Sequence, residues 1–249
     1  MAMSSSNPVF GNAPSLKTPT PQQLQEMYDA PQRLTLDAIV NRTAMLLGVL
    51  ILAGAGAWVL DAGPGLIGLA GIVGFGLALV NIFKRQITPA LVVAYAVCEG
   101  VFLGGISKVF EESGTYSGLP LQAAVGTAAI FSGVLWGYKS GRLRATPRFT
   151  KIVVGGFVGM FALILLNALL SWLGVADLGI RHAGGIGVLF SIGFIIFGSL
   201  TFVLDFDQAE RMIAAGVPER ESWRIAFGLV VGLVWLYMEI LRLLSYFRD

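Results

Sequence analysis

Charged residues are scarce in this chain. Only 13% of its 249 residues are Asp, Glu, Lys or Arg, whereas 55% are hydrophobic, and the mean hydropathy is +0.76. A soluble domain carries about 25% charged residues. Because this chain cannot cover a water-facing surface, we expect a lipid bilayer around it. The net charge of only +2 indicates no nucleic-acid partner.

Cysteine and histidine are almost absent. Cys98 and His182 are the only residues of their types, so an intrachain disulfide and a structural zinc site are excluded. The position of His182 in a loop disfavours a Ser–His intramembrane protease. Neither a phosphate-binding loop of the Walker type nor a His-Glu metalloprotease helix occurs. We therefore predict that the protein is not an enzyme and has no resident cofactor.

The N-terminal region lacks long apolar runs. It is rich in Ser, Pro, Asn and Gln, as in MAMSSSNPVFGNAPSLKTPTPQQLQ, which is typical of a disordered segment. No basic stretch followed by an apolar core is present, so this is not a signal peptide. We predict a disordered cytoplasmic tail over residues 1–40 and a membrane domain over residues 41–249.

Seven apolar stretches follow, each close to the roughly 20 residues that a membrane-spanning helix needs. They are continuous rather than alternating, which favours helices over a barrel. The sequence thus predicts an all-α integral membrane protein, a bundle of seven transmembrane helices. The spans are Thr43–Leu60, Gly65–Phe83, Pro89–Val109, Leu121–Tyr138, Ile152–Leu173, Gly185–Asp207 and Trp223–Phe247. The sixth should continue as a helix through QAERMIAAG, and small residues such as Gly100 and Gly104 should allow close helix packing.

The basic residues predict the orientation of the spans. Four of the seventeen fall on one side of the membrane: Lys108, Arg181, Arg242 and Arg248. The other thirteen fall on the opposite side, which the positive-inside rule assigns to the cytoplasm. We therefore expect a multi-pass protein of the cytoplasmic membrane with its N-terminus in the cytoplasm and its C-terminus at the outer face.

Four acidic residues lie at or within membrane depth: Glu99, Asp205, Asp207 and Glu239. A charge inside a span costs a few to more than ten kcal/mol, so such residues are functional candidates. Simpler interpretations exist for three of them. Asp207 can be interfacial, Glu239 can form a local ion pair with Arg242 three residues later, and Glu99 can be neutral and hydrogen-bonded to a backbone carbonyl.

Asp205 and Glu239 are placed symmetrically about residue 222, in the polar link GVPERESW. If the last two spans fold back on that link, the two carboxyl groups reach the same depth. A carboxyl pair of this kind shares a proton, and its deprotonation causes repulsion or invites a hard cation such as Ca²⁺. Asp207 is nearly as symmetric with Glu239 and is an alternative partner.

Three motifs carry a family resemblance: VCEGVFLGGIS in the third span, the aspartate and FDQAERM closing the sixth, and LVWLYMEILRLLS in the last. Over about residues 40–247 the chain resembles the Bax inhibitor-1 (transmembrane Bax-inhibitor-motif) family, most closely its bacterial branch. The resemblance implies a seven-helix bundle with the C-terminal helix central, and a pH-sensitive Ca²⁺ leak controlled by a paired-aspartate sensor. Asp205 and Glu239 match the sensor positions, although the best-studied members have Asp at the second. Arg42 matches a position that is often basic.

Two functions follow as hypotheses. The first is a pH-sensitive Ca²⁺ leak channel or Ca²⁺/H⁺-coupled transporter of the bacterial inner membrane, gated by the Asp205–Glu239 pair, which would also be the Ca²⁺ site. Glu99 and Asp207 would belong to its proton-sensing or ion pathway, and Arg242 and Arg42 would be ion-pair partners. The alternative is a regulatory protein that binds and modulates a membrane protease or another membrane partner, with the N-terminal tail contributing to binding.

Overall fold

The computed structural model describes residues 32–174 and 178–248. Within them, seven helices are long and apolar enough to cross a membrane, which confirms the predicted all-α fold. These helices are α3 (Leu36–Val59), α4 (Pro64–Phe83), α5 (Pro89–Glu112), α6 (Leu119–Lys139), α7 (Pro147–Trp172), α8 (Gly185–Ala214) and α9 (Ser222–Ser245), with the short 3₁₀ helix η2 (Glu219–Glu221) before α9.

The helix boundaries follow from local chemistry. Proline occupies the first turn of α4, α5, α6 and α7, where its missing N–H costs no helical hydrogen bond. The hydroxyls of Thr35 and Thr146 accept hydrogen bonds from the N–H groups of Ala38 and Phe149, both at 3.2 Å, and so cap α3 and α7. Gly216, at φ +66°, follows α8 and provides the left-handed residue that ends many helices.

Two boundaries bear on the predictions. Helix α8 continues to Ala214, which confirms the expected extension of the sixth span. Helix α3 begins at Leu36, before the predicted start at Thr43, so the last part of the expected tail is ordered. Leu34 is buried there, and its N–H donates to the carbonyl of Val217 at 2.8 Å. The predicted disordered segment otherwise lies outside the described residues.

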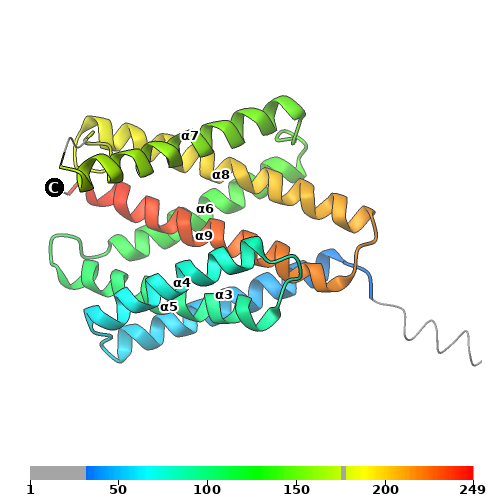
Figure 1. Ribbon diagram of the computed structural model, residues 1–249, viewed down its shortest axis with the longest axis horizontal. Coiled ribbons are helices and arrows are strands. Elements are labelled where there is room, and N and C mark those ends of the chain that lie inside the picture. The colour runs from blue at the N-terminus through cyan, green and yellow to red at the C-terminus, as the bar shows by residue number, and fades with distance from the viewer. Residues whose placement is uncertain (1–31, 175–177, 249) are drawn as a thin grey trace, which may run out of the picture.

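Helix α9 is the centre of the bundle (Figure 1). It packs against α3, α5, α6 and α8, and its residues Ala226, Val230 and Leu236 have no exposed surface. Helices α4 and α7 are peripheral, since α4 packs mainly on α5 and α7 on α8. This arrangement confirms the prediction of a central C-terminal helix.

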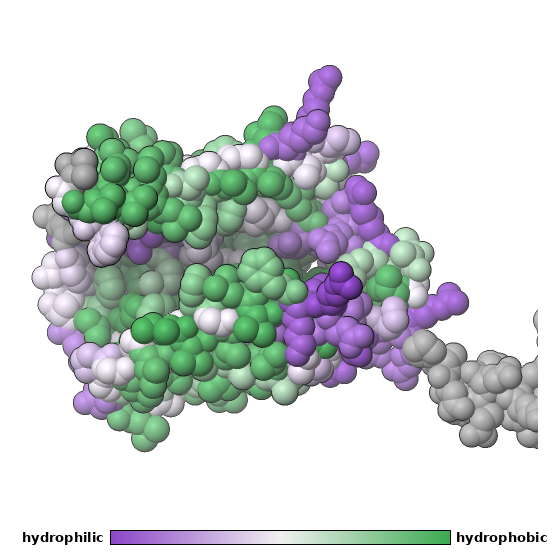
Figure 2. Space-filling view, in the orientation of Figure 1, coloured by the Kyte–Doolittle hydropathy of each residue, from purple (hydrophilic) through white to green (hydrophobic). Residues whose placement is uncertain are grey.

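The bundle has two distinct ends. We call the end that carries the α8–α9 link the link end, and the opposite one, where the chain terminates, the C-terminal end (Figure 1). Figure 2 shows a wide apolar surface over the bundle and hydrophilic side chains gathered mainly at the link end. An apolar surface of this extent fits a bilayer environment.

Helices α3 and α5 approach closely through glycine. A β-carbon added to Gly104 would collide with the backbone oxygen of Gly54, and one added to Gly100 would collide with the backbone oxygen of Leu50. The predicted close packing at Gly100 and Gly104 is therefore confirmed, because any side chain there would force the helices apart.

Candidate functional site

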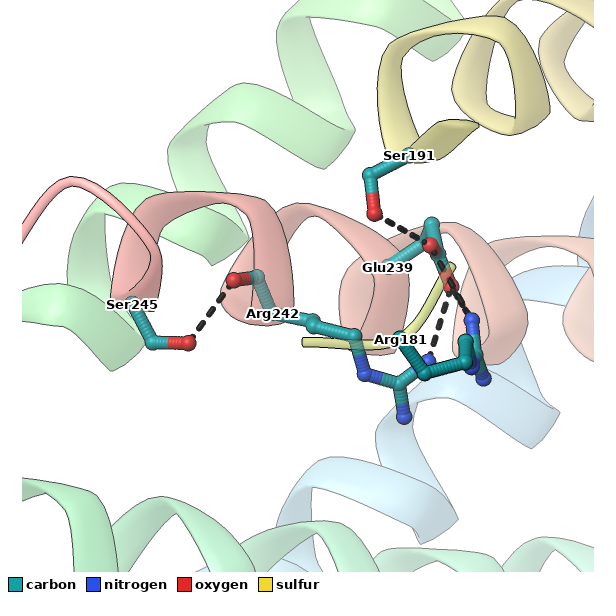
Figure 3. Close-up of polar contacts among 5 residues, drawn as sticks. All are labelled: Arg181, Ser191, Glu239, Arg242 and Ser245. Carbon is teal, nitrogen blue, oxygen red and sulfur yellow. Dashed lines mark hydrogen bonds and ion pairs between the residues drawn. The ribbon is translucent and has the colours of Figure 1, made fainter. Parts of the chain in front are cut away.

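The most completely buried acidic side chain of the described residues belongs to Glu239, on α9 near the C-terminal end. Its residue surface is only 2% exposed. One carboxylate oxygen, Oε1, accepts a hydrogen bond from the Ser191 hydroxyl of α8 at 2.9 Å. The other, Oε2, lies 3.1 Å from Nη1 of Arg181 and 3.3 Å from Nη1 of Arg242 (Figure 3). We call these four residues the Glu239 cluster.

Arg181 reaches Glu239 from the loop between α7 and α8. Three contacts hold this loop against the bundle. The Asn167 side chain of α7 accepts a hydrogen bond from the Leu178 N–H at 2.7 Å, and Ile180 is buried. The carbonyl oxygen of His182 lies where a β-carbon on Gly187 would stand, so the loop rests directly on the first turn of α8. The backbone on either side of Arg181 is therefore held against the bundle, within reach of Glu239.

Two positive charges face one negative charge in the cluster. The Arg181 and Arg242 side chains are 27% and 30% exposed, whereas Glu239 is almost fully enclosed. Their distances exceed the 2.7–2.9 Å typical of tight charge-assisted contacts. The carboxylate is thus compensated and covered by positive charge. Just beyond α9, burial raises the pKa of the Tyr246 phenol, which keeps its proton.

The predicted Asp205–Glu239 pair is wrong. Ser191, the α8 residue in contact with Glu239, precedes Asp205 by fourteen residues, or about 21 Å along a helix at 1.5 Å per residue. The ring of Phe202 lies against Gly232, which places Asp205 near the level of Leu229 on α9. Since Leu229 is apolar, Asp205 has no carboxylate opposite it. Asp207, even closer to the link end, cannot replace it as a partner of Glu239.

The error comes from the position of the turn. The predicted pairing requires GVPERESW to be one polar link centred on residue 222. In the structure the chain reverses at residues 215–218, because Glu219–Glu221 form η2 and α9 starts directly after it. The contacts of Ser191 with Glu239 and of Gly198 with Trp235 follow this earlier reversal. Each α8 residue therefore faces an α9 residue about ten or more positions earlier than symmetry about residue 222 predicts.

Aromatic side chains fill the bundle between the levels of Glu239 and Asp205. The Trp235 ring lies 4.3 Å from that of Phe194 and 5.3 Å from that of Phe157, measured between centroids. Phe202 contacts Phe131 in the same way at 5.0 Å. These edge-to-face contacts form a dense apolar layer that separates the two carboxyl groups.

Asp205 and Glu99 lack polar partners among the described residues. Asp205 is half-buried on α8, and no hydrogen bond or ion pair joins it to a residue within 32–174 or 178–248. Glu99 is buried on α5, where its Oε1 would lie 2.9 Å from a β-carbon on Gly74 of α4. Their proposed places in an ion pathway stay predictions.

The remaining predicted residues form ordinary pairs. Asp207 binds Arg211 one turn later at 2.7 Å, which fits the interfacial interpretation. Arg242 pairs with Glu239, as the local ion-pair interpretation expects. Arg42 pairs instead with Glu219 at 3.6 Å, and its guanidinium lies 4.8 Å from the ring centroid of Trp223.

A Ca²⁺ site shared by Asp205 and Glu239 is excluded by their separation. No group of three or more His, Cys, Asp or Glu side chains that could hold a metal exists in the described part of the chain. Glu239 and the Ser191 hydroxyl do present oxygen atoms of the kind that Ca²⁺ prefers as ligands, but both arginines occupy the carboxylate.

Sequence reasoning missed Arg181 and Ser191. Arg181 lies fifty-eight residues before Glu239, so no local spacing connects them. The available signal was weak: Arg181 is one of only four basic residues on its side of the predicted topology, where a buried carboxylate needs compensation. Ser191 gives no signal, since a serine in an apolar span usually bonds within its own helix.

Comparison with known proteins agrees with the fold. A search of curated proteins finds no match to the chain. A family model described as Bax inhibitor 1 like matches residues 7–249, which includes every helix described above. The predicted family is thereby confirmed: the chain belongs to the Bax inhibitor 1-like family, as a membrane protein of seven apolar helices.

Proposed function

We propose that the protein is a Ca²⁺ leak channel in which Glu239 is a cation-binding group and Arg181 a tethered blocking cation. One observation carries this proposal: a carboxylate only 2% exposed, on the central helix, is covered by an arginine from a loop. A buried carboxylate is costly in a membrane protein, and such residues often line ion pathways.

Competition between cations would control the leak. While Arg181 is bound, its guanidinium neutralises Glu239 and repels an approaching cation. A Ca²⁺ ion that displaces it gains the Glu239 carboxylate and the Ser191 hydroxyl as ligands. Weak binding then allows the ion to move on, as conduction requires.

The pathway would continue along α8 and α9 to Asp205. This carboxyl group has no described partner, so it is available to a passing ion. The aromatic layer around Trp235 would have to open between the two levels. Hydrophobic constrictions of this kind are known gates. Two single carboxyl groups at different depths thus take the place of the predicted pair.

We propose that the protein lies in the cytoplasmic membrane and that its link end faces the cytoplasm. The support for this orientation is the distribution of Lys and Arg: thirteen are assigned to the side of the link end and four to the opposite side. One of the thirteen, Lys17, lies outside the described residues. The Glu239 cluster then faces the outer side, from which Ca²⁺ would enter.

Calcium flux into liposomes tests the proposal. Arg181→Gln should increase the flux about tenfold if the lost ion pair is worth ~1.4 kcal/mol. Glu239→Gln should reduce it below the wild-type level, and the double variant should follow Glu239→Gln. Arg211→Gln is the control, because Arg211 pairs with Asp207 at the link end.

Absence of flux in both the wild type and Arg181→Gln would refute the channel. It would favour the other hypothesis, a regulatory protein that binds a membrane partner. A flux that Glu239→Gln leaves unchanged would show that the ions pass elsewhere.

A further inference from the structure

A groove of about 670 Å³ lies between α3 and α6, with α5 and α9 as its floor. Its walls come from residues 47–59 of α3 and 124–132 of α6. On α3 these residues lie toward the C-terminal end of the bundle, and the groove occupies that half. The Glu239 cluster is not part of it, although Tyr237 on the floor is only two residues from Glu239.

The groove exists because short side chains face each other across it. On α6 these are Ala124, Thr127 and Ala128, and on α3 they are Gly54 and Ala55. Helix α3 is drawn toward α5 by the Gly54–Gly104 contact. The space between α3 and α6 is therefore not filled by the protein itself.

The wall of the groove is apolar in its chemistry. The Thr127 hydroxyl donates to the Ala123 carbonyl at 2.8 Å, and the Ser107 hydroxyl donates to that of Leu103 at 2.5 Å. Tyr237 is hydrogen-bonded to Ser107 at 2.6 Å. Ser132 has the other hydroxyl of the lining. Because the other three hydroxyls are satisfied within the protein, a guest meets mainly hydrocarbon, and water gains too few partners to fill the space.

The groove opens onto the surface that the bilayer covers. At its rim on α3 stand the exposed side chains of Ile51 and Val59, and beside it on α6 stand those of Leu121 and Val125. These residues belong to helices that span the membrane. The hydrocarbon of the bilayer is therefore in direct contact with the mouth of the groove.

We propose that this groove binds an acyl chain of a membrane lipid, from the leaflet at the C-terminal end. An empty groove would leave its walls without dispersion contacts, and a flexible chain can restore them without burying a polar group. The volume lies in the range of about 300–1,000 Å³ that small-molecule sites have. Lipid binding here would not depend on ion conduction, because the groove is separate from the Glu239 cluster.

Photo-crosslinking tests this site. The full-length protein is reconstituted in phosphatidylcholine vesicles that contain a small fraction of phosphatidylcholine with a diazirine in its acyl chain. After irradiation, peptide mass spectrometry compares adducts on groove residues with adducts on the exposed α7 residue Leu163. We expect groove residues such as Ala55 and Ala128 to be labelled severalfold more than Leu163.

Two filled variants and one control complete the test. Ala128→Phe and Ala124→Leu place bulk in the groove and should reduce the excess labelling to the level of Leu163. Val158→Phe adds the same bulk on the exposed surface of α7, away from the groove, and should leave it unchanged. Equal labelling of the groove and Leu163 in the wild type would overturn the proposal. So would excess labelling that persists in Ala128→Phe or Ala124→Leu, provided that the variant unfolds at the same temperature as the wild type and is therefore folded.

Discussion

The two ends of the α8–α9 hairpin hold their acidic residues in opposite ways. At the C-terminal end, Glu239 is enclosed and shared by two arginines and a serine. At the link end, Asp207, Glu219 and Glu221 form pairs in which the acid keeps between 23% and 29% of its side chain exposed. The same pairing of acid and arginine thus has different energetics, because water reaches the acids of the second set but hardly reaches Glu239.

Burial indicates which charges this fold depends on. An exposed ion pair contributes about 0–1 kcal/mol, whereas removal of one partner from a buried pair costs about 3–5 kcal/mol, since the other charge is left uncompensated. We therefore expect substitutions at the C-terminal end to have larger effects than equivalent substitutions at the link end.

The largest effect is expected for Glu239→Ala. It leaves the Arg181 and Arg242 guanidinium groups facing each other, and the loss in unfolding free energy should be about 3 kcal/mol, because both keep some contact with water. Denaturant unfolding in detergent measures it. Asp205→Ala is the matched control, because it removes an acid without a described partner and should cost much less. Equal losses would contradict the comparison.

A smaller effect is expected for Gly187→Ala. Its new methyl group would collide with the His182 carbonyl and push the Arg181 loop away from Glu239. Overpacking of this kind costs about 1–3 kcal/mol. Thermal unfolding gives the loss in stability, and Ca²⁺ flux should rise as it does in Arg181→Gln, though less. Gly185→Ala is the control, since nothing lies within 4 Å of the position of its methyl group; a similar response there would exclude the loop as the cause.

At the link end, Arg42→Gln should cost about 1 kcal/mol or less, from the loss of an exposed ion pair and a cation–π contact. Arg42 contacts Glu219 and Trp223, so the substitution loosens the attachment of α3 to the start of α9. Chemical denaturation provides the measurement, with Arg220→Gln as an exposed neighbour for comparison. A loss as large as that of Glu239→Ala would remove the distinction between the two ends.

The smallest effect is expected for Asp207→Asn. Its pair with Arg211 is a single helical turn apart and Arg211 is 73% exposed, so the change should be about 0.3–0.5 kcal/mol. Because salt screens exposed charges, the difference from the wild type should vanish in high salt. Persistence of the difference at high salt would assign Asp207 a buried role.

Much of the fold was predictable from hydropathy. Each span was found because a membrane helix needs a long apolar run, and the extension of α8 to Ala214 followed from its polar residues and from Gly216. The start of α3 was placed too late, because Leu36–Asn41 includes Asp37 and lies beside a polar tail. Helix capping by Thr35 outweighed that polarity.

The candidate site was predictable only in part. Glu239 could be chosen because a charge in an apolar span is expensive, and its contact with Arg242 follows from helical spacing. Its other partners could not be found in this way. Arg181 and Ser191 reach it through the turn of the α7–α8 loop and the rotation of α8, and neither is encoded in a local pattern.

Three features follow from the amino-acid sequence alone: seven membrane helices, a resemblance to the Bax inhibitor-1 family, and a carboxylate in the last helix that needs compensation. Hydropathy suffices for the helices and the carboxylate, because lipid imposes the same requirement on every span, whereas the family follows from the motifs in the third, sixth and seventh spans. The packing of the helices and the α7–α8 loop was needed to show that Arg181 compensates Glu239 and that Asp205 has no polar partner among the described residues. The physical reason is helix register: each turn of helix is about 5.4 Å long, so a reversal of the chain a few residues earlier gives every side chain a different partner.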